Sequence, residues 1–509
     1  MGIRIETEKD PEVLRQAAKL LDVENQRLTQ KVLDLTRRLA KAEGTQQQDL
    51  ALHLAELERQ LANARQRLFG DSSEKRPKTK EKGSREKSHR RGHGPKSQPN
   101  LPIIEQVHDL DEADKVCPKC GRDLAEMQGK YEDSEEVDVI ERRFVIRKHR
   151  RKKYRCRCNG HVETALGPAK LIPGGRYSIG FGVEAAVAKY AEHLPLERQV
   201  MMMAREGLVV TSQTLWDQIA AVADAVKPIA DGIAAEVRRG GLVHVDETTW
   251  RMLSKEKKRW QAWGVVGENG VYYGLMDSRS ARAAAEVLGG YQGVLLSDGY
   301  KVYEKLARDG PGIVHAGCWA HVRRKYVEEE ERHPEACRRV LDLIGELYAV
   351  EREVPFERLV GKAAQERLGR RAELRAQRSR RIVAEIRAWA NEVAPTALPR
   401  SGLGRAVHYM LELWNALTRF LDDPRIPLDN NAAERALRGV VVGRKNHYGS
   451  KSRRGAEVAA VLYTVIETCK LVGVEPKAYL RKAVEAAVKG AEPMLLPHVM
   501  AVQGVPTAA

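Results

Sequence analysis

The stretch that decides the fold is Leu242-Val243-His244-Val245-Asp246, a short apolar run that ends in a carboxylate. A second run of the same design, Gly293-Val294-Leu295-Leu296-Ser297-Asp298, follows further along the chain. Apolar runs of about four to eight residues between turn residues are typical of buried strands. We therefore predict two strands that each end in Asp. Taken alone, either Asp could equally be an ordinary carboxylate in the turn after a strand.

The elements predicted around these two runs complete a mixed α/β pattern. Two more strands are expected at 260–266 and 271–276, joined by the turn-like Glu268-Asn269-Gly270. A helix over 281–288 leads into the second run, and another helix and a strand over 312–316 follow it. This is the element order of a ribonuclease H-like core, in which the first and fourth strands both carry a carboxylate.

Carboxylates at the ends of neighbouring strands converge, and their charges repel unless divalent cations neutralise them. Mg²⁺ prefers oxygen ligands, and two such ions roughly 4 Å apart can drive an in-line displacement at phosphorus. A third carboxylate is needed, and Asp429 and Glu434 are the candidates, in Leu428-Asp429-Asn430-Asn431-Ala432-Ala433-Glu434-Arg435. A helix is predicted to begin near Asn431, and Asn431 with Glu434 also matches a capping box. The residues alone leave this choice open.

Composition narrows the class of protein. The chain has 509 residues, with 87 Lys and Arg against 70 Asp and Glu, a formal net charge of +17. No apolar run reaches the roughly 20 residues of a membrane helix, no signal peptide is visible, and seven cysteines form no disulfide framework. We expect a soluble, intracellular, multidomain protein. The positive charge points to nucleic acid, with general solubility as the plain alternative.

The N-terminal part reads as a helix with a heptad repeat. Leucines recur every seven residues from Leu14 to Leu35, Asn25 lies in the alternate seam, and a second leucine series ends at Leu68. This pattern predicts a parallel two-stranded coiled coil, with packing on the chain's own core as the alternative. The basic, Gly- and Ser-containing stretch over 71–96 predicts either a flexible tether or an arm that contacts DNA.

Two close pairs of cysteines predict a structural zinc site. The pairs are Cys117 with Cys120 and Cys156 with Cys158, and His161 is a possible substitute ligand because the second pair is tightly spaced. The run 142–157 between and around them has ten basic residues and no acidic one. That run suggests phosphate contacts, or else a solvated strand face.

Two further regions are predicted to be helical. Residues 180–238 include a stretch, 196–216, with some helix-turn-helix character, although an ordinary helical hairpin fits it better. Residues 328–420 form a helical, Arg-rich region. Nine of the 29 residues over 361–389 are Lys or Arg, a pattern that suits either a solvated face or contact with the DNA backbone.

Several of these blocks together resemble the transposases of the insertion sequence 66 family. The resemblance covers nearly the whole chain, from the leading heptads and cysteine module onward. It rests on the segments 193–199 (HLPLERQ), 243–248 (VHVDET), 296–300 (LSDGY), 317–324 (GCWAHVRR), 428–435 (LDNNAAER) and 443–446 (GRKN), with the stretch from Tyr463 to Leu480. One departure is the second cysteine pair, which has one intervening residue where the family often has two.

The resemblance implies a ribonuclease H-like core whose catalytic triad is Asp246, Asp298 and Glu434, holding Mg²⁺ or Mn²⁺. The four cysteines remain the expected Zn²⁺ ligands. The assignment of the second pair is undecided, because only one residue separates its two cysteines. Residues expected to lie near DNA are Arg444, Lys445, His321, Arg323 and Arg324. For Arg444 and Lys445 a surface-charge role is the alternative, and for His321 a role in packing.

The resulting expectation is a multidomain α+β protein. Its predicted parts are a coiled coil (11–69), a basic linker (70–100), a zinc-binding module (101–170), a helical region with a possible helix-turn-helix (171–239), a ribonuclease H-like core in two parts (240–327 and 425–485) around a helical insertion (328–424), and a C-terminal tail (486–509). The implied function is cleavage of element ends and joining of the 3′ hydroxyl to target DNA, in the bacterial cytoplasm near the nucleoid. Expected partners are DNA, a second copy of the chain through the coiled coil, and accessory proteins of the element, with no membrane. The alternatives are a stand-alone nuclease on the same core and a zinc-containing coiled-coil DNA-binding regulator.

Overall fold

The computed structural model describes residues 122, 143–155, 161–253, 259–310, 312–356, 361–492 and 494–503. The predicted coiled coil, the basic linker and all four cysteines of the predicted zinc site lie outside these residues. Among the described residues, 146–503 belong to one compact unit, whereas 122 and 143–145 belong to another. A search of the described helices finds none that is both long and apolar enough to cross a membrane.

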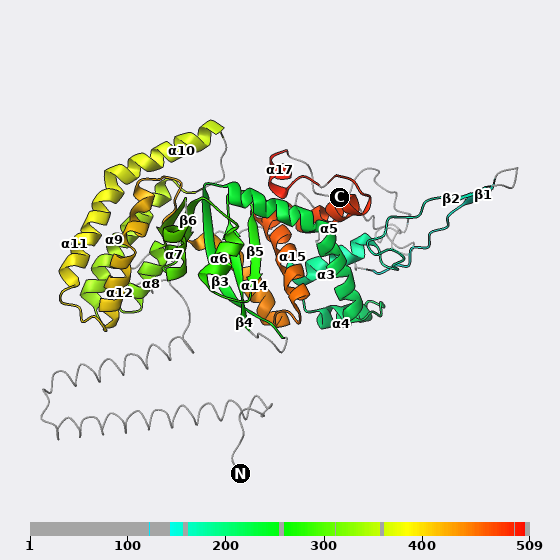
Figure 1. Ribbon diagram of the computed structural model, residues 1–509, viewed down its shortest axis with the longest axis horizontal. Coiled ribbons are helices and arrows are strands. Elements are labelled where there is room, and N and C mark those ends of the chain that lie inside the picture. The colour runs from blue at the N-terminus through cyan, green and yellow to red at the C-terminus, as the bar shows by residue number, and fades with distance from the viewer. Residues whose placement is uncertain are drawn as a thin grey trace, which may run out of the picture. The chain divides into compact units, whose positions relative to one another are not determined.

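A five-stranded mixed sheet organises the structure (Figure 1). Its strands, in spatial order, are β5 (Val271–Met276), β4 (Arg259–Val266), β3 (Leu242–Arg251), β6 (Gly293–Ser297) and β7 (Ile313–Gly317). The β3–β4–β5 pairs are antiparallel, and β6 and β7 run parallel to β3. This order is consistent with the predicted ribonuclease H-like core. The predicted strands are confirmed to within a residue or two, except that β3 continues to Arg251.

Helices cover both faces of the sheet. On β4, Gly264 leaves room for α14 (Asn431–His447), because an added Cβ there would lie 3.1 Å from Leu437. The neighbouring Trp263 meets Tyr303 of α7 (Lys301–Asp309) edge to face, with ring centroids 6.1 Å apart. Since successive strand residues point to opposite faces, α14 and α7 lie on opposite sides of the sheet. Helix α6 (Ala281–Leu288), predicted with these bounds, packs on the α7 side.

Backbone N–H groups of the edge strand β5 form hydrogen bonds to side chains of a helix. Two backbone N–H groups of β5, at Val271 and Tyr273, donate to the hydroxyls of Thr468 and Thr464, both at 3.1 Å. These threonines belong to α15 (Arg453–Leu471), which packs beside the long helix α5 (Ser212–Arg239). An edge strand whose donors are taken in this way cannot template pairing with another chain.

The helical region before the sheet is confirmed as helical. Helix α3 (Ile179–Tyr190) is followed by α4 (Leu196–Arg205), by Gly207 at φ +83°, and by α5. Thr211 caps α5 by accepting from the N–H of Thr214 at 3.1 Å. Helix α5 buries one face over its whole length, against α3, α15 and α16 (Pro476–Val488). It is therefore a core helix, and the helix-turn-helix stays a prediction.

Two short elements lie outside these regions of the chain. The strands β1 (Lys153–Arg155) and β2 (Val162–Thr164) form an antiparallel hairpin. Helix α17 (Pro497–Val502) is the last described helix.

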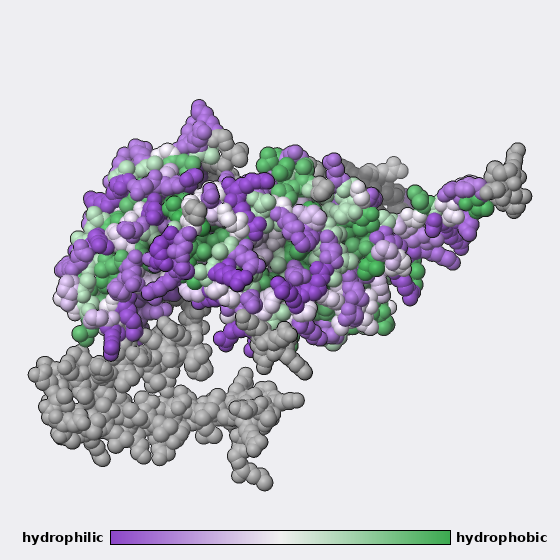
Figure 2. Space-filling model, in the orientation of Figure 1, coloured by the Kyte–Doolittle hydropathy of each residue, from purple (hydrophilic) through white to green (hydrophobic). Residues whose placement is uncertain are grey.

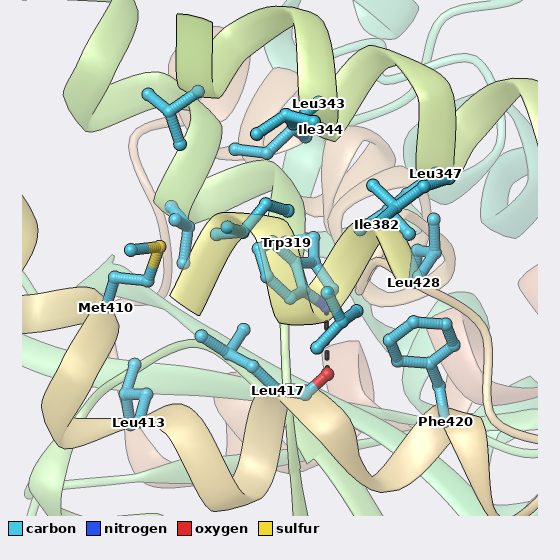
Figure 3. Packing of buried hydrophobic residues seen from close by; sticks show 14 of the residues in the cluster. Trp319, Leu343, Ile344, Leu347, Ile382, Met410, Leu413, Leu417, Phe420 and Leu428 are labelled. Carbon is cyan, nitrogen blue, oxygen red and sulfur yellow. Dashed lines mark hydrogen bonds between the residues drawn. The ribbon is translucent and has the colours of Figure 1, made fainter. Parts of the chain in front are cut away.

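The predicted helical insertion is helical and shares its core with the sheet. Its helices are α9 (Pro334–Glu353), α10 (Gly361–Leu374), α11 (Arg380–Val393), α12 (Gly402–Glu412) and α13 (Trp414–Thr418), with a π-helix at Arg375–Ser379 and a 3₁₀ turn at Arg419–Leu421, and α8 (Trp319–Val327) of the core leads into them. Trp319 is fully buried where these helices meet, and its Nε1–H donates to the carbonyl of Leu417 at 2.8 Å (Figure 3). The same apolar cluster includes Val294 and Leu296 of β6. The insertion is thus packed directly onto the β6–β7 side of the sheet.

Many of the arginines of the insertion have partners within the protein. Arg375 is fully buried and makes two 2.7 Å hydrogen bonds to Glu351. Other arginines on α10, the π-helix and α11 pair with acidic side chains, among them Arg370, Arg378, Arg380 and Arg381. These pairs favour a solvated, ion-paired face over a DNA-contacting one. Hydrophilic residues dominate the face drawn in Figure 2, consistent with such a surface.

Candidate active site

Two of the three predicted catalytic carboxylates lie on adjacent strands at matching positions. Asp246 is in the middle of β3, and Asp298 directly follows β6. In the parallel register of these strands, His244 pairs with Leu296. Continuing that register by two residues brings Asp246 beside Asp298. The prediction that the first strand ends in Asp246 is wrong, because β3 continues to Arg251, whereas Asp298 does follow the last residue of β6.

Asn430 brings the start of α14 to the same place. Its Nδ2 donates to the carbonyl of Val245 at 2.8 Å, and its Oδ1 lies 3.2 Å from His244 Nδ1. From Asn430, four helical residues lead about 6 Å along α14 to Glu434. From His244, two strand residues lead about 6.6 Å along β3 to Asp246. Both carboxylates thus lie a short way beyond the Asn430 contact, and the charge of Glu434 acts on Asp246.

The capping-box interpretation of this segment is wrong. Asn431 is the first residue of α14, Asn430 takes the N-cap position, and no side-chain cap hydrogen bond forms there. The Asn430 side chain instead forms hydrogen bonds to β3. The Glu434 carboxylate does not cap the helix and lies 3.6 Å from Nε2 of His321. The rival carboxylate, Asp429, accepts a hydrogen bond from the N–H of Asn431 at 3.2 Å and interacts with Tyr348 of α9.

The electrostatics of Asp246 reflect its neighbours. Burial, the adjacent Glu247, and the charges of Asp298 and Glu434 raise the pKa of Asp246 to about 7. Mutual repulsion of this kind indicates that the three carboxylates share one region. Within the described ranges, no three His, Cys, Asp or Glu side chains already form a metal-binding cluster. The donor chemistry of the three carboxylates fits a hard cation.

A second buried carboxylate stands directly next to Asp246. The Glu247 side chain is only 1% exposed, and its two oxygens accept from Arg279 and from the hydroxyl of Tyr303. Burial and this carboxylate raise the pKa of Tyr303 well above its ordinary value. Glu247 therefore fixes Arg279 at the edge of the site, and its guanidinium also lies 3.9 Å from the centroid of Tyr300.

Beside Asp298 the surface opens into a cavity of about 370 Å³. Its lining combines acidic, basic and aromatic side chains from the sheet, α8 and the insertion: Arg279, Asp298, Gly299, Tyr300, His321, Arg324, Lys325, Glu328 and Tyr409. Tyr409 of α12 holds the loop that carries Asp298, because its hydroxyl accepts from the N–H of Gly299 at 3.1 Å. The insertion thus supplies one wall of the candidate site.

The residues expected to lie near DNA are spread over two places. His321 and Arg324 line the cavity, and Arg323 follows His321 closely on the partly buried α8. Arg444 lies near the far end of α14 and donates to the hydroxyls of Thr248 at 3.3 Å and Thr249 at 2.7 Å. Lys445 next to it is exposed. Arg444 is therefore tied to β3.

Two motifs on which the resemblance rests, HLPLERQ and GRKN, meet at this end of α14. The Nδ2 of Asn446 donates to the carbonyl of His193 at 3.3 Å. A Cβ on Gly443 would lie 2.1 Å from the hydroxyl oxygen of Tyr463 and 3.3 Å from Nδ1 of His193. Glycine is thus required where α14 passes α15.

Of the predicted zinc ligands, only the substitute His161 is described. Its ring is exposed, and Nε2 lies 3.1 Å from Glu163 on the same hairpin. The described basic residues of 143–155 are also mostly exposed. The cysteine assignment stays a prediction.

Sequence reasoning missed several residues of the site. Glu247 lay next to a predicted catalytic residue, and its position in an alternating strand could have marked it as buried on the opposite face. Asn430 was given no role, because the sequence indicated its neighbour Asn431 as the capping residue. Arg279 and Tyr409 carried no local signal, because their contacts join segments far apart in the chain.

The five-stranded mixed sheet and its surrounding helices are consistent with a ribonuclease H-like domain. Residues 174–458 match the Transposase IS66 family, and residues 114–159 match the zinc-finger binding domain of transposase IS66. Two similar relatives are the uncharacterized proteins y4jD and y4qI of Sinorhizobium fredii. They are 32% and 33% identical over 377 residues, which is 70% of this chain and 72% and 68% of theirs. The chain belongs to the IS66 family of transposases, with a zinc-finger binding domain and a DDE catalytic domain.

Proposed function

We propose that this transposase cleaves the ends of its insertion sequence and joins the freed 3′ hydroxyl to target DNA, acting in the bacterial cytoplasm. The observation that carries the proposal is geometric: the β3–β6 register brings Asp246 beside Asp298, and Asn430 hydrogen-bonds the start of the helix that carries Glu434 to β3. The raised pKa of Asp246, caused by burial and Glu247 and in part by Asp298 and Glu434, supports it. Three carboxylates from β3, the end of β6 and the first turn of α14 repel one another when they are empty of cations. Such a set favours a divalent cation and, through it, a phosphate.

In this proposal Asp246, Asp298 and Glu434 hold the divalent cations. Mg²⁺ or Mn²⁺ bound there supplies charge neutralisation and activation of an oxygen nucleophile for in-line phosphoryl transfer. Asn430 joins α14, which carries Glu434, to β3, which carries Asp246. Tyr409 keeps the Asp298 loop in place through Gly299. The zinc-finger domain, with Cys117, Cys120, Cys156 and Cys158 as ligands, and the coiled coil would bring DNA and a second copy of the chain to this core.

The test uses purified full-length protein, labelled element-end DNA and Mg²⁺ or Mn²⁺. We expect cleaved and joined products with the wild type and at least a 100-fold loss with Asp298→Asn or Glu434→Gln, since removal of one charge-stabilising group costs ~10²–10³ in rate. Asp309→Asn is the matched control, because Asp309 pairs with Lys305 on the exposed side of α7.

The other outcomes identify the rival functions. Cleavage without joined products would favour a stand-alone nuclease. DNA binding with no metal-dependent strand chemistry, unchanged in the carboxylate variants, would favour a regulator. Activity that is lost in Asp429→Asn and kept in Glu434→Gln would move the third carboxylate to Asp429.

A further inference from the structure

The cavity beside Asp298 carries two cations that the proposed chemistry does not use. Arg279 lies just before α6, Lys325 belongs to α8, and both line the cavity. Each is held against an aromatic ring: Arg279 lies 3.9 Å from the centroid of Tyr300, and Lys325 Nζ lies 4.4 Å from that of Tyr409. A cation over a ring is held in place while its charge stays available to an anion.

Lys325 in particular makes no ion pair among the described residues, although Asp298 and Glu328 share the lining of the cavity with it. Its side chain is half-buried, and across the part of the chain that the structure describes no acidic side chain forms an ion pair with it. Arg279 differs, because Glu247 accepts from it on one side while the guanidinium also borders the cavity. A partly desolvated ammonium group without a counter-ion favours an anionic ligand.

The cavity is continuous with the candidate active site. Asp298 and His321 are part of its lining, and His321 also contacts Glu434. Gly299 closes the loop tightly onto the insertion, since an added Cβ would lie 2.5 Å from Tyr409 and 2.6 Å from Leu413. A volume of about 370 Å³ is enough for a nucleotide-sized group, because ligand cavities start near ~300 Å³. A DNA strand whose phosphate lies at Asp298 places a neighbouring phosphate within reach of this cavity.

We propose that this cavity binds the phosphate next to the reacting one on the DNA strand, with Lys325 as the main cation and Arg279 as the second. The proposal rests on the proposed function, since it takes the strand at Asp298 to be DNA. Lys325 and Arg279 are positioning residues: they fix the strand beside the carboxylates. Tyr409 and Glu247 hold the two cations in turn.

The test measures equilibrium binding of fluorescein-labelled element-end duplex to full-length protein in Ca²⁺, over a series of salt concentrations. Lys325→Gln should weaken binding roughly 5- to 10-fold and lower the slope of log affinity against log salt by ~0.7–0.9, the value for one lost phosphate contact. Lys362→Gln removes the same charge from a side chain that is 89% exposed on α10, and should change neither quantity. Lys325→Arg keeps the charge and should keep most of the affinity.

The decisive readout pairs this residue with one phosphate. Duplexes carry a neutral methylphosphonate at each position around the cleavage site in turn. One position next to the reacting phosphate should weaken the wild type, and the same substitution should cost Lys325→Gln nothing further. If the losses simply add at every position, or if Lys325→Gln binds like Lys362→Gln, the phosphate subsite is wrong. This experiment measures binding and needs no strand cleavage. The proposed chemistry is tested separately, because an Asp298→Asn variant that stays active would contradict it.

Discussion

Asn430 joins the first turn of the helix that carries Glu434 to the strand that carries Asp246. Its side chain is fully buried and bonds to both His244 and the carbonyl of Val245, while its backbone N–H donates to the sulfur of Cys318 at 3.2 Å. A single side chain therefore joins the two elements that carry two of the three carboxylates. This is a residue at which packing and the candidate chemistry depend on the same atoms.

We expect Asn430→Ala to destabilise the protein by about 2–4 kcal/mol, because it leaves a buried carbonyl and a buried imidazole without partners. Urea unfolding measures the loss. Asn431→Ala is the matched control, since the Asn431 side chain makes no hydrogen bond among the described residues, and it should change stability by less than about 0.5 kcal/mol. Equal losses in both variants would contradict the bridging role.

The stability of the fold in acid should depend on His447. Burial, with Lys189 nearby, lowers the pKa of this imidazole to about 3. A histidine whose folded pKa is lowered contributes stability that is complete above its unfolded pKa of about 6.5 and is lost as the pH falls toward the folded value. Between pH 6.5 and 4 this amounts to as much as about 3 kcal/mol.

Replacement of His447 by Phe should therefore flatten the pH dependence of the urea midpoint between pH 6.5 and 4. The phenyl ring can keep the edge contacts that His447 makes with Trp250 and Tyr190. His408→Phe serves as the control, because His408 is 74% exposed and pairs with Glu412. A His447→Phe variant that loses stability in acid as steeply as the wild type would rule out this contribution.

At the scale of elements, the π-helix in the insertion is organised around one buried arginine. Arg375 bonds to Glu351 of α9 and to the carbonyls of Phe420, Asp423 and Ile426. A π-turn is seldom stable unless tertiary contacts hold it. The segment between α13 and α14 is therefore attached to α9 and the π-helix through this guanidinium.

Arg375→Met should cost at least about 3 kcal/mol, because it leaves Glu351 buried without its main partner. Arg381→Met should change stability by less than about 0.5 kcal/mol, since Arg381 is 77% exposed in a pair with Glu385 on the same helix. Adding Glu351→Met to Arg375→Met should recover part of the loss. A double variant that is less stable than the sum of the single ones would exclude a desolvated ion pair as the cause.

The crossing of α14 and α15 depends on a residue without a side chain. Gly443→Ala would place a methyl group 2.1 Å from the Tyr463 hydroxyl, and should cost about 1–3 kcal/mol by overpacking. Gly369→Ala on α10 meets nothing within 4 Å and should stabilise the protein by about 0.5–1 kcal/mol. Combining Gly443→Ala with Tyr463→Phe removes the clashing oxygen and should restore stability, measured by urea unfolding. No recovery would place the strain elsewhere.

At the scale of the whole molecule, the zinc-finger domain and the core should respond separately to loss of metal. We expect about one zinc per chain by elemental analysis, and none after Cys117→Ser with Cys120→Ser. The main unfolding transition should stay unchanged, because the predicted zinc ligands all precede α3 (Ile179–Tyr190), the first of the helices and strands that build the described core. A core transition that shifts with zinc would show that the two depend on each other.

Local patterns predicted much of the core. Alternation and apolar runs predicted the strands that carry or precede Asp246 and Asp298, and helix signals predicted α6 and the start of α14. Contacts between distant segments could not be predicted. His244 and Asn430 are 186 residues apart, so the local pattern, which suggested Asn431 as a cap, could not reveal that Asn430 bonds to β3. Tyr409 and Gly299 are separated by 110 residues and became neighbours only in the folded chain.

That contact between Gly299 and Tyr409 has a consequence for how such proteins diverge. The loop that carries Asp298 and the insertion pack against each other at a place where even one methyl group has no room. Related proteins should therefore inherit the two segments together, and a chimaera that takes its insertion from one relative and its loop from another should fail unless both sides of the contact come from the same parent. The insertion should therefore be inherited together with the candidate active site, although most of the insertion lies away from the carboxylates.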